Sequence, residues 1–487
     1  MRKSLGVFTV LLLLLVSMTA VSFAEVNQSG TEIEIEEEIL YGDKTVAEGL
    51  TLQIPVSVNG RMFWDTEYVV GDDPAARTDF RFYQDSHYEY GAYSGDGFSL
   101  EMYSGGGSST SGSMDLETQA PYGMADAFID VADRTGAGEK HTERVKYRDY
   151  YEYYPLNAYV QLNNGDECVG SRALRFGEEE SEKLSELEQL LGQFKVPIPE
   201  DCILEITIEK DADGDVKGYD FFMDGDGTLS WNSFSAVTED ALYYGIECRV
   251  ESPDGSRTPV AGMEEWYGVY RMPYEIVEEE LYERVEPGLD QIEKVLTLDT
   301  EISVLDMRLS KDHSKVLMFT AEGEMSYLNV LDLRTMETIQ RLELLPWGDK
   351  MVSREIILGE NLMIWMVSDD QMAVISEPES GIYQLEFTTG VWAEEFIYGK
   401  EAMHLTTGDM AVDYDGEKLA IVYPLGYYYR YERQDAKGTC MFWLMVYDQT
   451  GMLYCGEYST SQGIGEGYGS AWANIRSDVK MGVSWDE

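Results

Sequence analysis

Short runs of alternating apolar and polar residues fill most of this chain, and turn-forming residues separate the runs. The clearest series lies at 302–344, where polar turns at 310–315, 321–324 and 334–337 divide four runs. A period of two residues is typical of β-strands, because successive side chains point to opposite faces of a sheet. Four strands in so short a segment predict one blade of a β-propeller.

Two later segments repeat this order of turn and strand. Residues 356–387 contain three shorter strands, and residues 410–458 contain a polar turn followed by an apolar strand. The repeat is structural rather than strictly periodic, because residues 426–438 are inserted into the last segment.

The first half of the chain is also rich in predicted strands. Asn59-Gly60 is the strongest two-residue hairpin signal, and alternating runs at 50–58 and 61–70 flank it. Further strands are predicted at 78–83, 99–103, 202–210, 216–223, 246–251 and 266–274.

Three other segments carry specific expectations. Residues 104–113 contain only Ser, Gly and Thr, so we expect a flexible loop there. Residues 124–131 and 141–154 are expected to pair as a hairpin, and residues 31–41 are expected to form an edge strand.

Helical periodicity predicts one helix, at residues 178–194. Leu184, Leu187 and Leu191 recur at helical spacing, and the glutamates at 178–180 lie in the first turn, where the helix dipole favours negative charge.

These elements predict an all-β, β-propeller-like fold of roughly six to eight irregular blades with one inserted amphipathic helix. The alternative is an N-terminal β-sandwich to about residue 170 followed by a smaller propeller. We expect the last strand, near 480–485, to pair with an N-terminal strand. The expected divisions are a signal peptide at 1–24, an acidic leader at 25–49, an N-terminal β region at 50–170, a helical insertion at 171–200, a β region at 201–290 and propeller blades at 291–487.

The N-terminus has the form of a secretory signal. Arg2 and Lys3 precede an uncharged run, and small residues at Ser22 and Ala24 predict cleavage before Glu25. The alternative is an uncleaved anchor, because the uncharged run at 5–24 is long enough to span a bilayer. We expect an extracellular or envelope protein without a stable membrane span once the signal is cleaved.

The strong negative charge restricts the partners. The chain has 91 acidic and 36 basic residues and a net charge of −55 at pH 7, which repels nucleic acids and anionic lipids. The acidity either attracts cations and basic peptides or keeps an exported protein soluble, and solubility is the favoured interpretation. The odd number of cysteines favours buried thiols over disulfides; they are Cys168, Cys202, Cys248, Cys440 and Cys455.

The turns of the predicted blades carry a resemblance to a known repeat. Asp312 and Lys315 precede four apolar residues, and a later strand ends in Asp332 with Thr335 three places on. This pattern resembles bacterial β-propeller repeats that begin with a Ser-Pro-Asp-Gly-Lys turn, and it covers about a third of the chain. Residues 41–82 are similar to exported clostridial proteins of unknown function. The resemblance implies export and a propeller fold, and it implies no activity.

Aspartate-rich turns are the candidate calcium ligands: Asp211, Asp213, Asp215, Asp224 and Asp226. An EF-hand loop needs Gly at its sixth position and Glu at its twelfth, but counting from Asp211 these are Val216 and Phe222. Turn formation is therefore the favoured interpretation, and calcium is the one cofactor that the sequence leaves open.

Clustered tyrosines are the candidate ligand-binding residues: Tyr427, Tyr428, Tyr429 and Tyr431. Their rings either form a stacking surface for a sugar or peptide or fill space between strands. A second tyrosine cluster, at 150–154, favours the packing role more strongly.

No catalytic signature is recognisable in the sequence. We therefore expect an exported, non-catalytic binding or scaffold protein that uses the loops of a propeller face to hold a peptide, glycan or envelope partner. The alternative is a propeller glycoside hydrolase, because 91 carboxylates must include pairs in space that sequence alone cannot identify.

Overall fold

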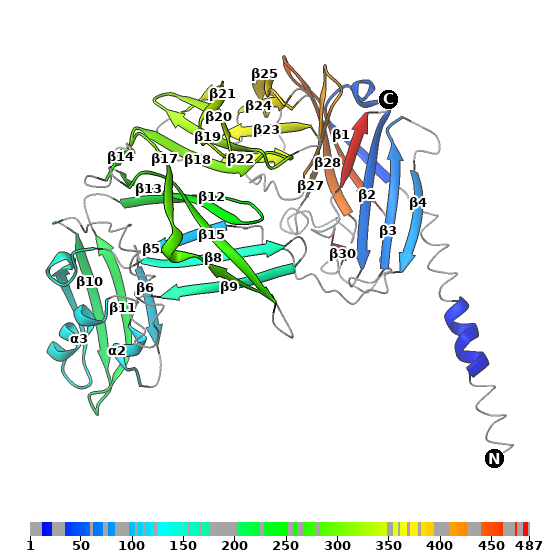
Figure 1. The fold of residues 1–487 in the computed structure, drawn as a ribbon. Coiled ribbons are helices and arrows are strands. Elements are labelled where there is room, and N and C mark those ends of the chain that lie inside the picture. Colours follow the sequence, from blue (N-terminus) through cyan, green and yellow to red (C-terminus); the bar gives the residue numbers. More distant parts are fainter. Residues whose placement is uncertain are drawn as a thin grey trace. The chain divides into compact units, whose positions relative to one another are not determined.

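The computed structural model divides the chain into two compact units, unit 1 with residues 1–93 and 352–487 and unit 2 with residues 94–351. The structure describes residues 12–21, 35–58, 62–71, 76–82, 97–102, 106–110, 113–120, 124–153, 156–164, 167–175, 198, 200, 202–224, 228–251, 257–260, 264, 266–278, 283–347, 354–358, 361–367, 371–377, 381–393, 410–425, 440–460, 473–474 and 481–485. Most of them belong to antiparallel β-sheets (Figure 1), so the predicted all-β class is confirmed.

The predicted blade at 302–344 is present in unit 2. Its four strands pair in sequence order and are β18 (Ile302–Leu309), β19 (Lys315–Glu322), β20 (Met325–Asp332) and β21 (Thr338–Pro346). Six consecutive residues of β19, from Val316 to Ala321, are buried. Burial on both faces of a strand explains why this run is continuously apolar rather than alternating.

The aspartates of the repeat pattern close the hairpins of the blades. Asp312 accepts a hydrogen bond from the backbone N–H of Ser314 at 3.1 Å. Asp332, Asp415 and Asp448 likewise accept hydrogen bonds from backbone N–H groups two or three residues later. Each side chain thus substitutes for a backbone carbonyl in a tight turn, which explains the recurrence of Asp at these positions.

A larger sheet of unit 2 packs against this blade. Phe234, Tyr243 and Val269 of the larger sheet share a core with Val304 and Met318 of the blade. Its strands are β12 (Thr228–Val237), β13 (Ala241–Glu251), β14 (Arg257–Pro259), β15 (Gly268–Glu278), β16 (Glu283–Pro287) and β17 (Glu293–Thr297), and the 3-10 turn η3 (Leu289–Gln291) precedes β17. This core fixes the connection that runs from β17 to β18.

A three-stranded sheet and an α/β layer complete unit 2. The three-stranded sheet consists of β5 (Gly97–Met102), β8 (Leu156–Asn164) and β9 (Glu167–Arg175). The α/β layer, called here the inserted module, consists of β6 (Gly106–Thr110), α2 (Leu116–Gln119), α3 (Ala125–Arg134), β7 (Lys140–Lys146), η2 (Tyr147–Asp149), β10 (Ile203–Lys210) and β11 (Val216–Asp224). Its sheet has the order β6-β11-β10-β7. Phe128 and Val131 of α3 share a core with Leu204 and Ile206 of β10.

Two expectations for the module were wrong. Residues 106–110, expected in a flexible loop, form the edge strand β6, because a strand needs only backbone pairing and Gly107 lets the ring of Phe221 approach closely. Residues 125–134, expected within a hairpin, form helix α3. Met124, Phe128 and Val131 are buried and are spaced as on one face of a helix, whereas the prediction of a strand assumed alternation of apolar and polar residues. The helix predicted at 178–194 lies outside the described residues.

Unit 1 contains two further blades, at the places predicted from 356–387 and 410–458, and in each four strands pair in sequence order. The first consists of β22 (Arg354–Leu358), β23 (Leu362–Val367), β24 (Gln371–Ser376) and β25 (Gln384–Gly390). This blade has one strand more, β22, than the three that the sequence predicted. The second consists of β26 (Ala411–Tyr414), β27 (Leu419–Pro424), β28 (Cys440–Asp448) and β29 (Gly451–Thr460). A third sheet contains the predicted hairpin of β2 (Leu50–Val58) and β3 (Met62–Val69), followed by β4 (Ala76–Phe82).

The second blade of unit 1 lies between the other two sheets. Alternate residues of β28 enter different cores: Trp443 and Met445 pack with β22–β25, whereas Phe442 and Leu444 pack with β2 and β3. Packing of blade on blade through both faces is the arrangement of a β-propeller.

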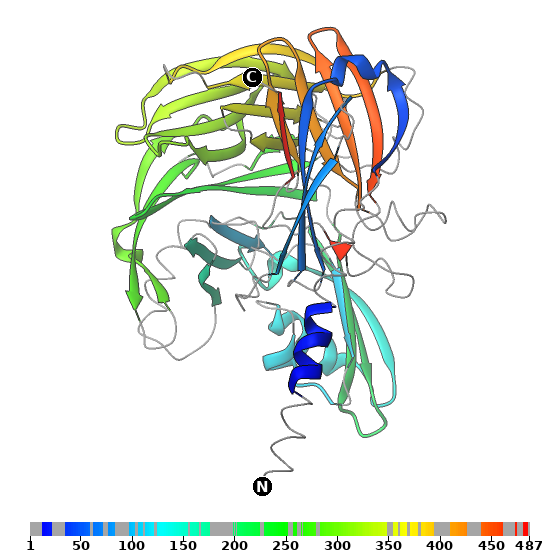
Figure 2. The same cartoon turned by 90° about the vertical axis from the view of Figure 1, so that its right-hand side faces the viewer.

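Both ends of the chain add strands to unit 1 (Figures 1 and 2). The C-terminal strand β31 (Gly482–Trp485) pairs with β2 from Gln53 to Leu50, which confirms the predicted pairing of the chain ends; β30 (Ala473–Asn474) also pairs with β2. The N-terminal strand β1 (Ile35–Gly42) pairs with β29, which confirms the predicted edge strand, and the 3-10 turn η1 (Lys44–Ala47) leads on to β2.

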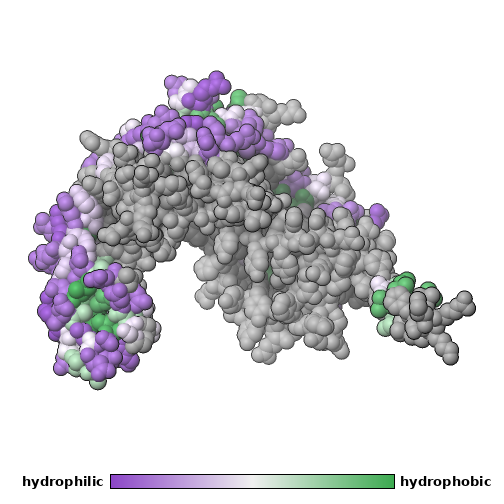
Figure 3. All heavy atoms as spheres, turned by 60° about the horizontal axis from the view of Figure 1, so that its bottom comes forward, coloured by the Kyte–Doolittle hydropathy of each residue, from purple (hydrophilic) through white to green (hydrophobic). Residues whose placement is uncertain are grey.

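Residues 12–21 form a helix with exposed apolar side chains, seen as the green cluster at the right of Figure 3. Within the described part of the chain, no helix is both long enough and apolar enough to cross a bilayer. Cys202, Cys248 and Cys455 are buried, as expected.

Candidate functional site

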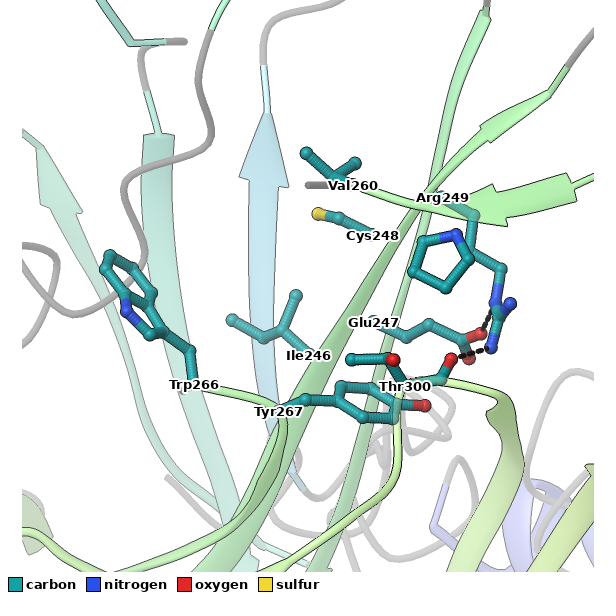
Figure 4. A pocket seen from close by; sticks show the side chains of 9 residues that line it. Ile246, Glu247, Cys248, Arg249, Val260, Trp266, Tyr267 and Thr300 are labelled. Atoms are coloured by element: carbon teal, nitrogen blue, oxygen red, sulfur yellow. Dashed lines mark hydrogen bonds and ion pairs between the residues drawn. The ribbon is translucent and has the colours of Figure 1, made fainter. Parts of the chain in front are cut away.

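A small cavity lies in unit 2 where β13, β14 and the start of β15 meet the connection from β17 to β18 (Figure 4). Adjacent antiparallel strands alternate in direction, so the β13–β15 and β17–β18 connections reach the same edge of the sheet. The cavity is lined by Ile246, Glu247, Cys248, Arg249, Pro259, Val260, Trp266, Tyr267 and Thr300.

The polar side of the cavity is a buried ion pair. Glu247 and Arg249 are 6% and 9% exposed, and the Nε of Arg249 donates to Oε1 of Glu247. The guanidinium also donates from Nη2 to the carbonyl oxygen of Thr300 at 2.9 Å. Ser303 donates from its hydroxyl to Glu247 at 2.7 Å. The charges therefore have protein partners, as buried charges require.

The same contacts join the larger sheet to the first strand of the blade. Tyr267 donates from its hydroxyl to the carbonyl oxygen of Ile302, and Asn232 donates from Nδ2 to that of Val304 at 2.9 Å. Side chains from three strands of one sheet thus fix the path of residues 300–304.

The other side of the cavity is apolar. Figure 4 shows the Trp266 ring on the side opposite the ion pair, with Ile246 and Cys248 between them. The cavity volume is about 20 Å³. Such a space holds an ordered water or a methyl-sized group, and it is far below the volume of typical small-molecule sites.

Burial suppresses ionisation of the weakly acidic groups at the cavity. Burial raises the pKa of the Cys248 thiol to about 12, and the neighbouring charge of Glu247 acts in the same direction. Burial also raises the pKa of Tyr267. For Arg249, burial is the largest single influence and lowers the pKa, but the charges of Glu247 and Tyr267 and the hydrogen bonds to them together outweigh it, so the pKa is raised. At neutral pH the thiol and the phenol stay protonated and the guanidinium stays charged.

These features make the cavity poorly suited to acid–base or nucleophilic chemistry. Among the described residues that line it, Glu247 is the one with a carboxylate, and that carboxylate is held by Arg249 and Ser303. Glycoside hydrolysis needs two carboxyl groups on either side of a sugar ring. The arrangement instead serves to hold two sheets and their edge connections in one geometry.

A second buried polar cluster lies in unit 1 and involves β1. Tyr454 and Tyr458 are fully buried, and their hydroxyls lie 2.8 Å apart. Both donate to Oε1 of Glu37, at 2.8 Å and 3.3 Å, and the ammonium of Lys44 pairs with the other oxygen of Glu37. Burial is the main cause of the raised pKa of both tyrosines and raises the pKa of nearby Tyr68 to about 12.

The predicted calcium ligands lie at two separate places. Asp211, Asp213 and Asp215 form the turn between β10 and β11, where Oδ1 of Asp211 accepts hydrogen bonds from the N–H groups of Asp213 and Asp215, both at 2.9 Å. Asp224 ends β11, roughly 30 Å farther along the strand at 3.3 Å per residue. Asp226 lies outside the described residues. Across the described ranges, no three His, Cys, Asp or Glu residues converge in a way that could hold a metal ion.

The predicted ligand-binding tyrosines Tyr427, Tyr428, Tyr429 and Tyr431 also lie outside the described residues. Most of the second tyrosine cluster, at 150–154, lies within the described residues. Tyr151 accepts a hydrogen bond from the N–H of Asp126 in the first turn of α3, and Tyr150 donates to Asp130. Tyr147 is fully buried in the module core. These contacts agree with the packing role that the sequence favoured for this cluster.

The Glu247–Arg249 pair was not among the residues predicted from the sequence. The available signal was two opposite charges two residues apart within the apolar strand β13. Residues i and i+2 of a strand share a face, so a buried pair could have been inferred, but its partners Thr300 and Ser303 are more than fifty residues away.

Comparisons with known proteins found similar solved structures but no match to a family model or a curated sequence. The chain is similar in structure to the β-propeller domain of Cps50 (Swd1) from Myceliophteria thermophila, at 12% identity over 51% of this chain and 80% of that one, with a TM-score of 0.20. It is also similar to a Lactobacillus plantarum protein (10% identity, 64% of this chain, 92% of that one, TM-score 0.21). A third similar structure is the NanB sialidase of Streptococcus pneumoniae, at 10% identity over 64% of this chain and 59% of that one, with a TM-score of 0.23. Scores this low carry no argument about function, and the assignment of the fold rests on the strand pairing described above.

Proposed function

We propose that this chain is an exported, non-catalytic binding protein that uses the loops of a propeller face to hold a peptide, glycan or envelope partner. The observation that carries the proposal is the state of Glu247, which has the one carboxylate among the described lining residues of the cavity and is buried and bound by Arg249 and Ser303. A carboxylate in this state rigidifies an edge of the sheets and is not free to transfer protons.

Three sequence features support the same proposal. The N-terminus has the features of a secretory signal, the Asp turns resemble bacterial β-propeller repeats, and residues 41–82 are similar to exported clostridial proteins. The excess of acidic residues favours partners without strong negative charge. Tyr427, Tyr428, Tyr429 and Tyr431 remain the proposed contact residues, and calcium binding at the Asp211 turn remains a separate proposal.

A combined binding and turnover experiment tests this function. The mature chain, residues 25–487, is screened by thermal shift against glycans, cell-wall fragments, basic peptides and calcium. The same preparations are incubated with chromogenic glycosides and a peptide library. We expect a shift of the melting temperature with one partner class and no turnover. Turnover of a glycoside or peptide that a Glu→Gln or Asp→Asn substitution at a propeller face abolishes would overturn the proposal in favour of a hydrolase.

A further inference from the structure

The sheet of the inserted module has one covered and one open face. Leu204, Ile206 and Ile208 of β10 are buried beneath α3. The residues between them, Glu205 and Thr207, point to the opposite face, because side chains alternate along a strand. Figure 1 shows α2 and α3 beside the sheet strands β10 and β11.

The strand register fixes which residues share the open face, because directly paired residues of antiparallel strands point to the same side. One row across β6, β11, β10 and β7 contains Gly106, Phe222, Glu205 and Arg144, and the next contains Ser108, Asp220, Thr207 and Thr142. In the described strands the face is therefore an array of polar and charged side chains around one aromatic ring.

Phe222 is the apolar centre of this face. Its side chain is 59% exposed, although the adjacent Phe221 is buried on the helix side. Its partner across β6 is Gly106, which has no side chain to cover the ring on that side. An accessible ring on a flat polar surface can stack on the apolar face of another ring.

The open face is also close to neutral in a strongly acidic protein. Arg144 pairs with Glu205 at 3.3 Å, and Lys217 pairs with Glu209 at 2.8 Å. The described charged residues of the face are Lys140, Arg144, Lys146, Lys217, Glu205, Glu209, Asp220 and Asp224, four basic and four acidic, whereas the whole chain has 91 acids against 36 bases. A near-neutral surface complements an uncharged polymer, and it gives a basic peptide no electrostatic reason to bind here.

The remaining groups of the face suit a sugar chain. The hydroxyls of Thr142 and Thr207 lie 2.8 Å apart at its centre, and Ser108 extends the row on β6. Hydroxyl and carboxylate groups form hydrogen bonds with sugar hydroxyls, while an aromatic ring stacks on the C–H face of a pyranose. From the row of Lys146 to that of Lys140 the face extends roughly 20 Å, which is long enough for several sugar rings.

We propose that the open face of the β6-β11-β10-β7 sheet binds an uncharged polysaccharide, with Phe222 stacking on a sugar ring and Glu205, Thr207 and Thr142 bonding to hydroxyls. The proposal rests on the binding function proposed above. It adds a ligand class and a site distinct from the propeller loops.

Affinity electrophoresis tests this site. The mature acidic chain migrates through native gels that contain a soluble β-glucan, xylan or mannan, and insoluble cellulose and chitin are used in pull-downs. We expect at least one polysaccharide to retard the wild-type chain. Phe222→Ala and Phe222→Leu should weaken that binding at least tenfold, whereas Phe222→Trp should retain it. The Phe222→Leu variant keeps an apolar side chain beside Gly106, so it can replace Phe222→Ala in the test if the Ala variant unfolds.

Ile339→Ala is the matched control, because Ile339 is 57% exposed on β21, outside the module. This variant should bind as the wild type does. The inference is overturned if no polysaccharide binds the wild-type chain, or if the Phe222→Leu variant binds equally well. If substitution of Phe222 leaves polysaccharide binding unchanged, or if only a peptide gives a thermal shift, this site is wrong but the proposed binding function still holds. Substrate turnover instead removes the proposed function.

Discussion

At the scale of single residues, the roles that could be predicted from the sequence are those in which a side chain contacts only its neighbours along the chain. Asp312 and Asp332 each accept hydrogen bonds from backbone N–H groups two or three residues later. Such a contact is encoded within one turn and needs no tertiary structure to form. The role of Glu247 depends on Ser303, which lies 56 residues away, so no local pattern could reveal it.

Removal of Glu247 should destabilise unit 2 strongly. In Glu247→Ala the charge of Arg249 stays buried beside Thr300 without its carboxylate partner, which typically costs about 3–5 kcal/mol in the free energy of unfolding. Urea denaturation of the full chain, followed by hydrogen exchange in β13 and β18, measures this cost.

The matched control is Glu209→Ala, which breaks an ion pair with Lys217 whose side chains are 41% and 56% exposed. An exposed pair contributes about 0–1 kcal/mol, so this variant should remain close to the wild type. Replacing both Glu247 and Arg249 with Met should recover much of the lost stability. Equal costs for the two single variants would contradict the assigned role of the buried pair.

At the scale of elements, periodicity identified the strands that pair with sequence neighbours. The blade β18–β21 follows the predicted strands closely, because each hairpin turn limits which residues can pair. The assignments of α3 and β6 were wrong for two physical reasons. The apolar residues of α3 recur with the period of a helix but were interpreted with the period of a strand. Strand β6 forms because it pairs with β11, which lies more than one hundred residues later.

The partly buried carboxylate of Glu37 should hold strand β1 in place. In Glu37→Ala the hydroxyls of Tyr454 and Tyr458 lose their acceptor, and a lost hydrogen bond to a charged group costs about 1.5–3 kcal/mol. Hydrogen exchange of β1 and of its partner β29 should therefore accelerate, while exchange in β18–β21 of unit 2 stays unchanged.

Glu36→Ala is the control for this variant, because Glu36 is the exposed neighbour of Glu37 on the same strand. Its exchange should match the wild type. If β1 exchanged at the wild-type rate in Glu37→Ala, the backbone ladder to β29 alone would be sufficient to hold the strand.

At the scale of the whole molecule, unit 1 is assembled from both ends of the chain. β31 pairs with β2, and β1 pairs with β29. Unit 2 contains a continuous segment, 94–351, whose cores consist of its own residues. Loss of a chain end should therefore affect the two units differently.

Truncation after Met481 should weaken unit 1 selectively. The truncation removes the pairing of β31 with β2 and the half-buried side chains of Val483 and Trp485, at a cost of roughly 2–4 kcal/mol by the usual value of buried apolar surface. Limited proteolysis should then cleave unit 1 at lower urea concentrations while unit 2 persists. Truncation after Trp485 leaves β31 intact and should behave as the full chain does. Simultaneous loss of both units in the shorter chain would show that they do not unfold separately.

The sequence by itself determined the β-class, the turn residues and the blades β18–β21, β22–β25 and β26–β29, which follow from alternation, turn chemistry and hairpin register acting over a few residues. The pairing of the last strand with the N-terminal part was expected from the propeller fold that these blades predict. Tertiary structure alone decided the Glu247–Arg249 cavity, the Glu37 cluster and the open face around Phe222. Each joins residues from distant segments, and burial and register, which place them together, exist only once the sheets have packed.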